Sequence, residues 1–146
     1  MSGSVMTFNY DDGLSAQSYR GGVSQVQARW TSDSSAGTAS GTTRKIVGRL
    51  VKVVTVPGSP TPTNGYTVTL TDGNGVNLLT SCDKTLAANQ SSSSAQETYL
   101  LVKSYDGSPV AVAVHPAVGD KLTIAVSGAG NSTQGQIFLY YEPVAP

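Results

Sequence analysis

The sequence is short of charged residues. Lys, Arg, Asp and Glu make up 12% of its 146 residues, about half of the roughly 25% found in soluble domains, and Ser, Thr, Gly, Asn and Gln take their place. The nine basic and nine acidic residues cancel, so the chain lacks the basic excess of a nucleic-acid-binding protein. A polar surface with few charges suits permanent contact with other protein, because the centres of protein interfaces are depleted of charge.

Residues that commonly catalyse or bind metals are equally scarce. The chain has one cysteine, Cys82, and one histidine, His115. A single cysteine excludes an intrachain disulfide, and one cysteine with one histidine cannot make a zinc site of the usual composition. A nucleophile needs a base beside it, and no sequence feature links Cys82 to His115, which ends an apolar run directly before Pro116. We therefore predict no catalytic residue and no cofactor.

The carboxylates lie mostly in turns. Asp72, Asp106 and Asp120 each adjoin a glycine, and turn geometry explains this pairing, because Asp bonds its own backbone and Gly adopts positive φ. The two opposed carboxylates of a glycosidase therefore have no support in the pattern, and we predict that the protein is not an enzyme.

Long apolar runs are missing. No segment approaches the roughly 20 residues of a membrane-spanning helix, and no signal-peptide core follows Met1. We expect a chain with no membrane partner that is made and assembled in the cytoplasm.

A period of two residues dominates what is present, and it is typical of β-strands. In residues 24–31 it places Val26, Ala28 and Trp30 on one face, and in residues 66–71 it places Tyr66 and other apolar residues inward. Gly48 interrupts a β-branched run as a candidate bulge or point of close approach. About eight strands are expected, at residues 24–31, 45–56, 66–71, 76–79, 97–104, 110–116, 121–127 and 136–143.

Short strands separated by Gly, Pro, Asn and Asp predict one all-β domain, a single antiparallel β-sandwich that is jelly-roll-like. The sandwich is expected over residues 23–146. Residues 1–22 show scattered aromatics and end in Gly-Gly, so they are expected to form a flexible N-terminal arm. The arm would either fray or dock on a neighbour through Phe8, Tyr10 and Tyr19.

The stretch "DGNG" at residues 72–75 raises the possibility of calcium binding. An EF-hand loop starting at Asp72 needs oxygen ligands at its first, third and fifth positions, Gly at the sixth and Glu at the twelfth. Asp72 and Asn74 fit, whereas Val76, Asn77 and Asp83 occupy the last three of these positions. The sequence instead predicts a hairpin turn between residues 66–71 and a strand around Val76–Leu79, and no metal site.

Four motifs together resemble a family of small structural proteins encoded by tailed bacteriophages. They are "RWTSDSSAGTASGTT", the run from Ile46 to Gly58, "PTNGYTVTLTDGNGVNLL" and "GAGNSTQGQIFLYY", and they fall within residues 28–141. The resemblance implies a virion component, and small β-sandwich proteins of this kind act as capsid cement or decoration proteins. It brings no catalytic residues with it.

A cement protein needs a rigid core, loops that contact the shell and apolar surface for association. The expected partners are the major capsid protein and further copies of the chain, as a homodimer or a homotrimer, with no nucleic acid; the expected location is the capsid surface. Candidate contact residues lie in the arm, the proline loop and the C-terminal strand: Phe8, Tyr10, Tyr19, Pro57, Pro60, Pro62 and Tyr141. Alternation places only one of Tyr140 and Tyr141 outward.

An alternative is a tail or baseplate module that contacts host carbohydrate. Loops rich in Ser, Thr and Asn, together with Trp30, would suit sugar contacts, although Trp30 alternates with Val26 and Ala28 and is expected in the core.

Overall fold

The structure, a computed structural model, describes residues 3–11, 24–75, 77–78, 90–99 and 117–143. In these residues the chain is almost entirely β-structure, and seven strands form one antiparallel sheet. The spatial order is β1-β2-β7-β3-β6-β4, with β5 paired to β3. The strands are β1 (Val5–Asp11), β2 (Ser24–Thr31), β3 (Ala39–Pro57), β4 (Thr67–Thr71), β5 (Gln96–Tyr99), β6 (Ala117–Ser127) and β7 (Gln134–Pro143).

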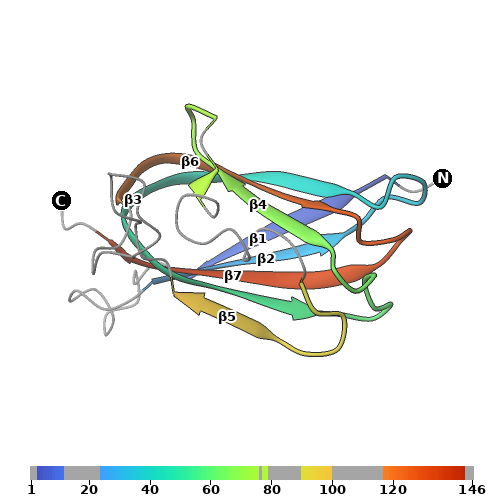
Figure 1. The fold of residues 1–146 in the computed structure, drawn as a ribbon. Coiled ribbons are helices and arrows are strands. Elements are labelled where there is room, and N and C mark those ends of the chain that lie inside the picture. Colours follow the sequence, from blue (N-terminus) through green and yellow to red (C-terminus); the bar gives the residue numbers. More distant parts are fainter. Residues whose placement is uncertain (1–2, 12–23, 76, 79–89, 100–116, 144–146) are drawn as a thin grey trace, which may run out of the picture.

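Strand β3 joins the two halves of the sheet. Its first half, Ala39–Arg49, pairs with β6, and its second half, Gly48–Pro57, pairs with β7. Figure 1 shows that β3 curves at one end of the molecule, so that its two halves run in opposite directions. The sheet therefore folds over, and β4 and β6 face β2 and β7. We call this curved end the bend end and the opposite end the loop end.

Gly48 allows the two halves to meet. It pairs with Val118 of β6 and with Pro143 of β7, and it adopts φ of 156°. A Cβ at this position would overlap the carbonyl oxygen of Glu142. Only glycine gives both the conformation and the space, so the prediction of a close approach at Gly48 is confirmed.

The core lies between the two folded halves of the sheet. Alternate residues of β2, β4, β6 and β7 are buried there, and the predicted inward positions of residues 24–31 and 66–71 are confirmed. The rings of Trp30 and Tyr66 meet across the core with centroids 5.7 Å apart. A small void is lined from both halves, by Val53, Val68, Leu70, Ile124, Ile137 and Leu139.

Two polar atoms in this core have no hydrogen-bond partner among the described residues, the indole nitrogen of Trp30 and the hydroxyl of Tyr66. Burial raises the pKa of Tyr66, and the neighbouring Thr55 hydroxyl offsets only part of that rise. The Thr55 hydroxyl does not donate its hydrogen to Tyr66, because it donates to Oε1 of Gln90 at 2.6 Å.

Strand β1 corrects the expectation of an arm. Residues 5–11 pair with β2 along its whole length, from Val5↔Thr31 to Asp11↔Gln25, and so form an edge of the sheet. Met6, Phe8 and Tyr10 are partly buried and pack against the core. The alternation of these residues with Thr7 and Asn9 is the period-2 signal of a strand, which the scattered spacing of the other aromatics obscured.

Two strands begin earlier than predicted. Strand β3 starts at Ala39, within a segment expected to be a loop, and β6 starts at Ala117, within the expected turn 117–120. The first extension depends on Gly41, because the Phe8 ring occupies the place of its side chain. A bulge between Thr42 and Lys45 shifts the β3–β6 register, and there the Thr43 hydroxyl accepts the N–H of Leu122 at 3.1 Å.

The turn at residues 72–75 forms as predicted. Asp72 O accepts the N–H of Gly75 at 3.1 Å, and the Asp72 carboxylate accepts that of Asn74 at 2.9 Å. An antiparallel bridge, Thr71↔Asn77, follows the turn, and the rest of the expected second strand, residues 76 and 79, lies outside the described residues. Oδ1 of Asn77 also accepts the N–H of Leu70 at 3.3 Å. Strand β4 pairs with β6.

At the loop end, Asp33 organises residues 33–38. Its Oδ1 accepts the N–H groups of Ala36, Gly37 and Ser35 at 2.5, 2.8 and 3.2 Å, and its Oδ2 accepts the Thr38 hydroxyl at 3.2 Å. These bonds, that from Ala36 above all, lower the pKa of Asp33. The carboxylate therefore fixes a loop and is not a free acid.

Candidate interaction surface

The part of the chain that the structure describes contains no group of three or more His, Cys, Asp or Glu side chains arranged to hold a metal ion. Cys82 and His115 lie outside the described residues. Nor does any helix within the described ranges have the length and apolar character needed to cross a bilayer.

The broadest candidate is the outward side of β1, β2, β7, the second half of β3, and β5. The register places its side chains in rows that cross the strands, for example Val54 beside Phe138 and Gln27. We call this surface the outer face. Its members are Thr7, Asn9, Gln25, Gln27, Arg29, Lys52, Val54, Val56, Glu97, Gln136, Phe138 and Tyr140.

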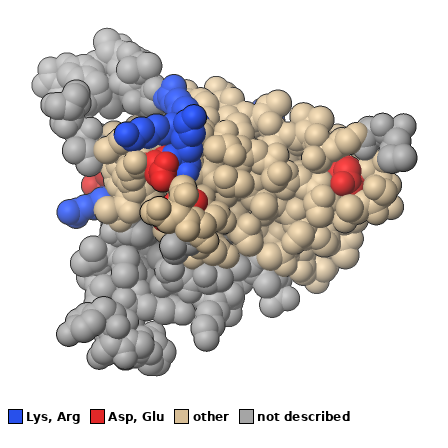
Figure 2. All heavy atoms as spheres, turned by 90° about the horizontal axis from the view of Figure 1, so that it is seen from above, with Lys and Arg blue, Asp and Glu red and all other residues tan. Residues whose placement is uncertain are grey.

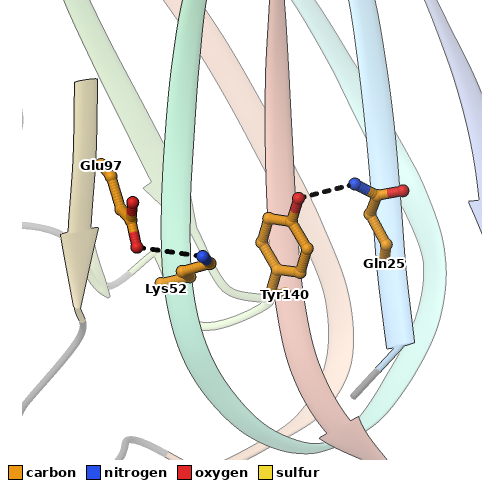
Figure 3. A network of polar contacts seen from close by, with 4 residues as sticks. All are labelled: Gln25, Lys52, Glu97 and Tyr140. Atoms are coloured by element: carbon orange, nitrogen blue, oxygen red, sulfur yellow. Dashed lines mark hydrogen bonds and ion pairs between the residues drawn. The ribbon is translucent and has the colours of Figure 1, made fainter. Parts of the chain in front are cut away.

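Side chains from four strands of the outer face are tied together (Figure 3), and Glu97, which stands opposite Val54, reaches diagonally to Lys52 in the neighbouring row. Nζ of Lys52 lies 3.0 Å from Oε1 of Glu97 and 4.8 Å from the centre of the Tyr140 ring. The Tyr140 hydroxyl accepts Nε2–H of Gln25 at 2.9 Å. An ion pair, a cation–π contact and a hydrogen bond thus fix these long side chains before any partner arrives, which lowers the entropy cost of binding.

The neighbouring rows are apolar and amide-rich. Gln27 donates to Gln136 at 2.8 Å, and Phe138 and Val54 are half-buried between the amides and the Lys52 row. Among the members named above, Arg29, Lys52 and Glu97 carry charge. Tyrosine and phenylalanine surrounded by amides, with few charges, are typical of the centre of a protein interface.

A hollow of about 200 Å³ lies where the outer face meets the loop end. Its rim includes Val5 and Thr7 of β1, Arg29 of β2, and Gln136 of β7, and Gly58 closes one side. The Arg29 side chain is exposed and makes no ion pair or hydrogen bond with the described residues. The hollow therefore offers a guanidinium, a hydroxyl and an amide to a small polar group.

The predicted contact residues of the first strand bind their own chain. Phe8 stacks on Tyr10 with ring centroids 6.3 Å apart. The Tyr10 hydroxyl accepts the backbone N–H of Arg44 at 2.9 Å, and the Arg44 guanidinium lies 4.1 Å from the centre of the Tyr10 ring. Both aromatics thus fasten β1 to the first half of β3. Tyr19 lies outside the described residues.

The prolines occupy different environments at the loop end. Pro57 ends β3 and is half-buried, Pro60 is exposed after a cis peptide bond with Ser59, and Pro62 is buried. Pro60 O accepts the N–H of Gln134 at 2.9 Å. This loop is therefore bonded to the start of β7, beside the hollow.

Tyr141 corrects one predicted contact. It is 6% exposed and belongs to the core, because β7 alternates and Ile137, Leu139 and Tyr141 point inward. The outward aromatic residues of this strand are Phe138 and Tyr140, which the list of predicted contact residues did not include. The sequence showed the alternation but not its phase; the apolar residues Ile137 and Leu139 were the available signal.

The turn at residues 72–75 borders a second hollow, of about 230 Å³, at the bend end. Asp72, Asn74 and Asp120 line it with residues 117–119. The Asp120 carboxylate lies against Gly73, where a Cβ would overlap it, and it also accepts the N–H of Lys121 at 2.8 Å. Two carboxylates and an amide share this hollow, and the turn already uses the Asp72 carboxylate.

Charge is concentrated at the bend end. Figure 2 shows Lys, Arg, Asp and Glu side chains gathered at one end of the face in view, with a broad uncharged body beside them. Arg44, Lys45 and Arg49 lie on the curved part of β3, and Lys121 lies near the start of β6. On the face in view, most charged side chains of the described residues thus lie at the bend end, and one acidic side chain lies at the opposite end.

Comparison of the chain with models of protein families, with curated proteins and with solved structures gives no match.

Proposed function

We propose that the protein is a structural component of a bacteriophage virion, a cement or decoration protein that binds the major capsid protein and stabilises the shell. In this proposal the chain acts at the capsid surface after assembly in the host cytoplasm and has no catalytic activity. The proposal joins the resemblance of four sequence motifs to phage structural proteins with the surface described above.

The outer face is the observation that carries the proposal. It is wide, rich in amide and aromatic side chains and held by cross-strand bonds, so few side-chain motions are lost when a partner covers it. Complete burial of the Phe138 and Tyr140 side chains by a partner would contribute about 1–2 kcal/mol of binding free energy for each residue. Such modest contacts suit a protein attached at many repeated positions, since several linked contacts multiply the strength of attachment.

The folded sheet supports the finer architecture as well. We propose that the sheet forms a β-sandwich with jelly-roll-like character, in which β4 and β6 form one layer and β2, β7 and the second half of β3 form the other. Opposed layers are supported by the void between Val53, Val68 and Ile124 and by the Trp30–Tyr66 contact. The edge strand β1 would then be available for contact with further copies of the chain, as a dimer or trimer.

Cryo-electron microscopy of the virus particle that carries the protein tests the placement. Copies in icosahedral order on the shell would support the cement role, whereas density confined to the tail would contradict it. In a binding assay with shells assembled from the major capsid protein, Phe138→Glu should abolish attachment without changing the fold. Thr69→Glu, on the outward side of β4, is the matched control and should attach normally.

A second candidate is a tail or baseplate module that binds host carbohydrate. Trp30 cannot contact sugar, because it is 2% exposed, but Tyr140 and the hollow beside Arg29 offer an aromatic ring, amides and a guanidinium. Calorimetry with glycans from the host surface distinguishes the two candidates. Saturable binding lost in Arg29→Ala would favour the carbohydrate role, and its absence would favour cement.

A further inference from the structure

The outward side of the sheet at the bend end forms a basic strip. It consists of Lys45, Val47 and Arg49 on β3 and Ala117, Gly119 and Lys121 on β6. All six residues are exposed, and Val47, at 46%, is one of two large hydrophobic residues among those described that stand open to solvent. The register places Lys45 opposite Lys121, Val47 opposite Gly119 and Arg49 opposite Ala117. Cations therefore flank a shallow floor of small and apolar residues.

The arrangement is electrostatically unfavourable in the free protein. Lys45 and Lys121 are direct neighbours on paired strands, and like charges in that position repel each other. Neither lysine side chain makes an ion pair or hydrogen bond with the described residues, and the same holds for Arg49.

The carboxylates among the described residues do not neutralise the strip. Asp120 is directed to Gly73, on the other side of the sheet from Lys121. Glu142 stands opposite Arg49 in the β3–β7 register, but these two side chains form no ion pair. Within the described ranges the strip thus presents three cations against one carboxylate on the same side of the sheet, which is the arrangement that an acidic partner would complement.

We propose that the basic strip binds an acidic segment of a partner protein, which in the proposed function is an acidic segment of the shell protein. The identity of the partner rests on the proposed function, whereas the acidic chemistry rests on the strip itself. The strip is continuous with the outer face, because Arg49 lies beside Glu142 of β7, the strand that carries Phe138 and Tyr140. A partner seated on the outer face therefore reaches the strip at the bend end.

Other occupants fit less well. A second copy docked by two-fold symmetry would place cations opposite cations. The described acidic residues away from the bend end are engaged, Glu97 with Lys52 and Asp33 with its own loop, so these residues offer a second copy no free acidic surface there. Nucleic acid would gain only three phosphate contacts and would leave Val47 uncovered, whereas a peptide can cover the apolar floor and supply carboxylates.

The test compares the double variant Lys45→Gln/Lys121→Gln with the charge-preserving control Lys45→Arg/Lys121→Arg. Binding is measured to capsid shells and, separately, to a fluorescent poly-glutamate peptide, in low and in physiological salt. We expect the glutamine variant to bind both probes about tenfold more weakly and with less salt dependence. The arginine variant should bind both like the unmodified protein. The glutamine variant should also be at least as stable as the unmodified protein, because the repulsion is removed.

The outcomes separate this inference from the proposed function. If the unmodified protein and the glutamine variant bind shells equally well, the proposed role of the basic strip is overturned. The cement role then remains intact. Binding to poly-glutamate but not to shells overturns the cement role and supports the strip. Binding to duplex DNA in physiological salt that is lost in the glutamine variant, without binding to poly-glutamate, would show that the strip serves nucleic acid and would overturn the inference. Lower stability of the glutamine variant would assign the two lysines a structural role and also count against it.

Discussion

Gly48 shows how a single residue governs the path of the chain. Strand β3 leaves one half of the sheet and enters the other at this position, and the Glu142 carbonyl oxygen occupies the space of a side chain. The β-branched residues around it, such as Val47 and Val51, favour an extended strand. The glycine permits the close approach of β7 that an uninterrupted β-branched run would prevent.

Gly48→Ala should therefore lower the free energy of unfolding by about 2–4 kcal/mol, through the strained φ and the overlap with Glu142. Gly119→Ala, also at the bend end, is the control, because nothing lies within 4 Å of its Cβ, and it should stay within about 0.5 kcal/mol of the unmodified protein. Urea denaturation measures both. Equal stability of the two variants would contradict this prediction, because it would show that the backbone at residue 48 shifts to accommodate the added Cβ.

Asp33 makes the stability of the folded protein depend on pH in the acidic range. Hydrogen bonds from Ala36, Gly37, Ser35 and Thr38 lower its pKa in the folded state, so its contribution to stability is complete above the unfolded value of about 3.9 and disappears as the pH falls through the folded pKa. Asp33→Asn keeps the shape but removes the charge, so it should lower the melting temperature at pH 7. The difference from the unmodified protein should shrink as the pH falls below about 4. A difference that stays constant with pH would contradict this account.

At the scale of elements, the sequence predicted well where a strand has one buried and one outward side. Strands β2, β4 and β7 appear close to their expected positions, and the inward phases of β2 and β4 were read correctly. Register and partner choice were less accessible. Strand β4 pairs with β6 although a short turn follows it, because long-range pairing depends on how the whole sheet folds.

The candidate surface was predicted less completely than the fold. Aromatic residues were predicted to contact a partner, but Phe8 and Tyr10 are partly buried against the chain itself, and Tyr141 faces the core. An exposed aromatic and a buried one look alike in sequence until the phase of the strand is known. The basic strip depends on the pairing of β3 with β6, which sequence alone cannot give.

Strand β1 supplies the prediction that belongs to this scale. Phe8→Ala should reduce the free energy of unfolding by about 1–3 kcal/mol, since the partly buried ring packs over Gly41 and stacks on Tyr10. Val5→Ala, in the same strand at a residue 54% exposed, should change it by less than about 0.5 kcal/mol. Chemical denaturation compares the two. If both variants unfold at the same urea concentration as the unmodified protein, β1 does not contribute to the stability of the sheet.

At the scale of the whole molecule, β7 stands between β2 and β3 and pairs with both along its length. A chain ending before Gln134 should lose the cooperative unfolding transition, because both neighbours lose their hydrogen-bond partner and the core loses Ile137, Leu139 and Tyr141. A chain lacking residues 1–11 loses only the edge strand β1 and should unfold cooperatively at a lower temperature. Calorimetry measures both chains. A sharp transition in the first chain would show that the sheet closes without its central strand.

The pairing of β3 also has a consequence for folding during synthesis on the ribosome. Strands β2, β3 and β4 find their main partners in β6 and β7, within residues 117–143. Residues 117–143 must therefore leave the exit tunnel before the central sheet can close, and the apolar sides of the earlier strands stay unpaired until then. Such distant pairings make folding slow, so chaperones that shield nascent chains have their longest opportunity to act on the segment between β2 and β6.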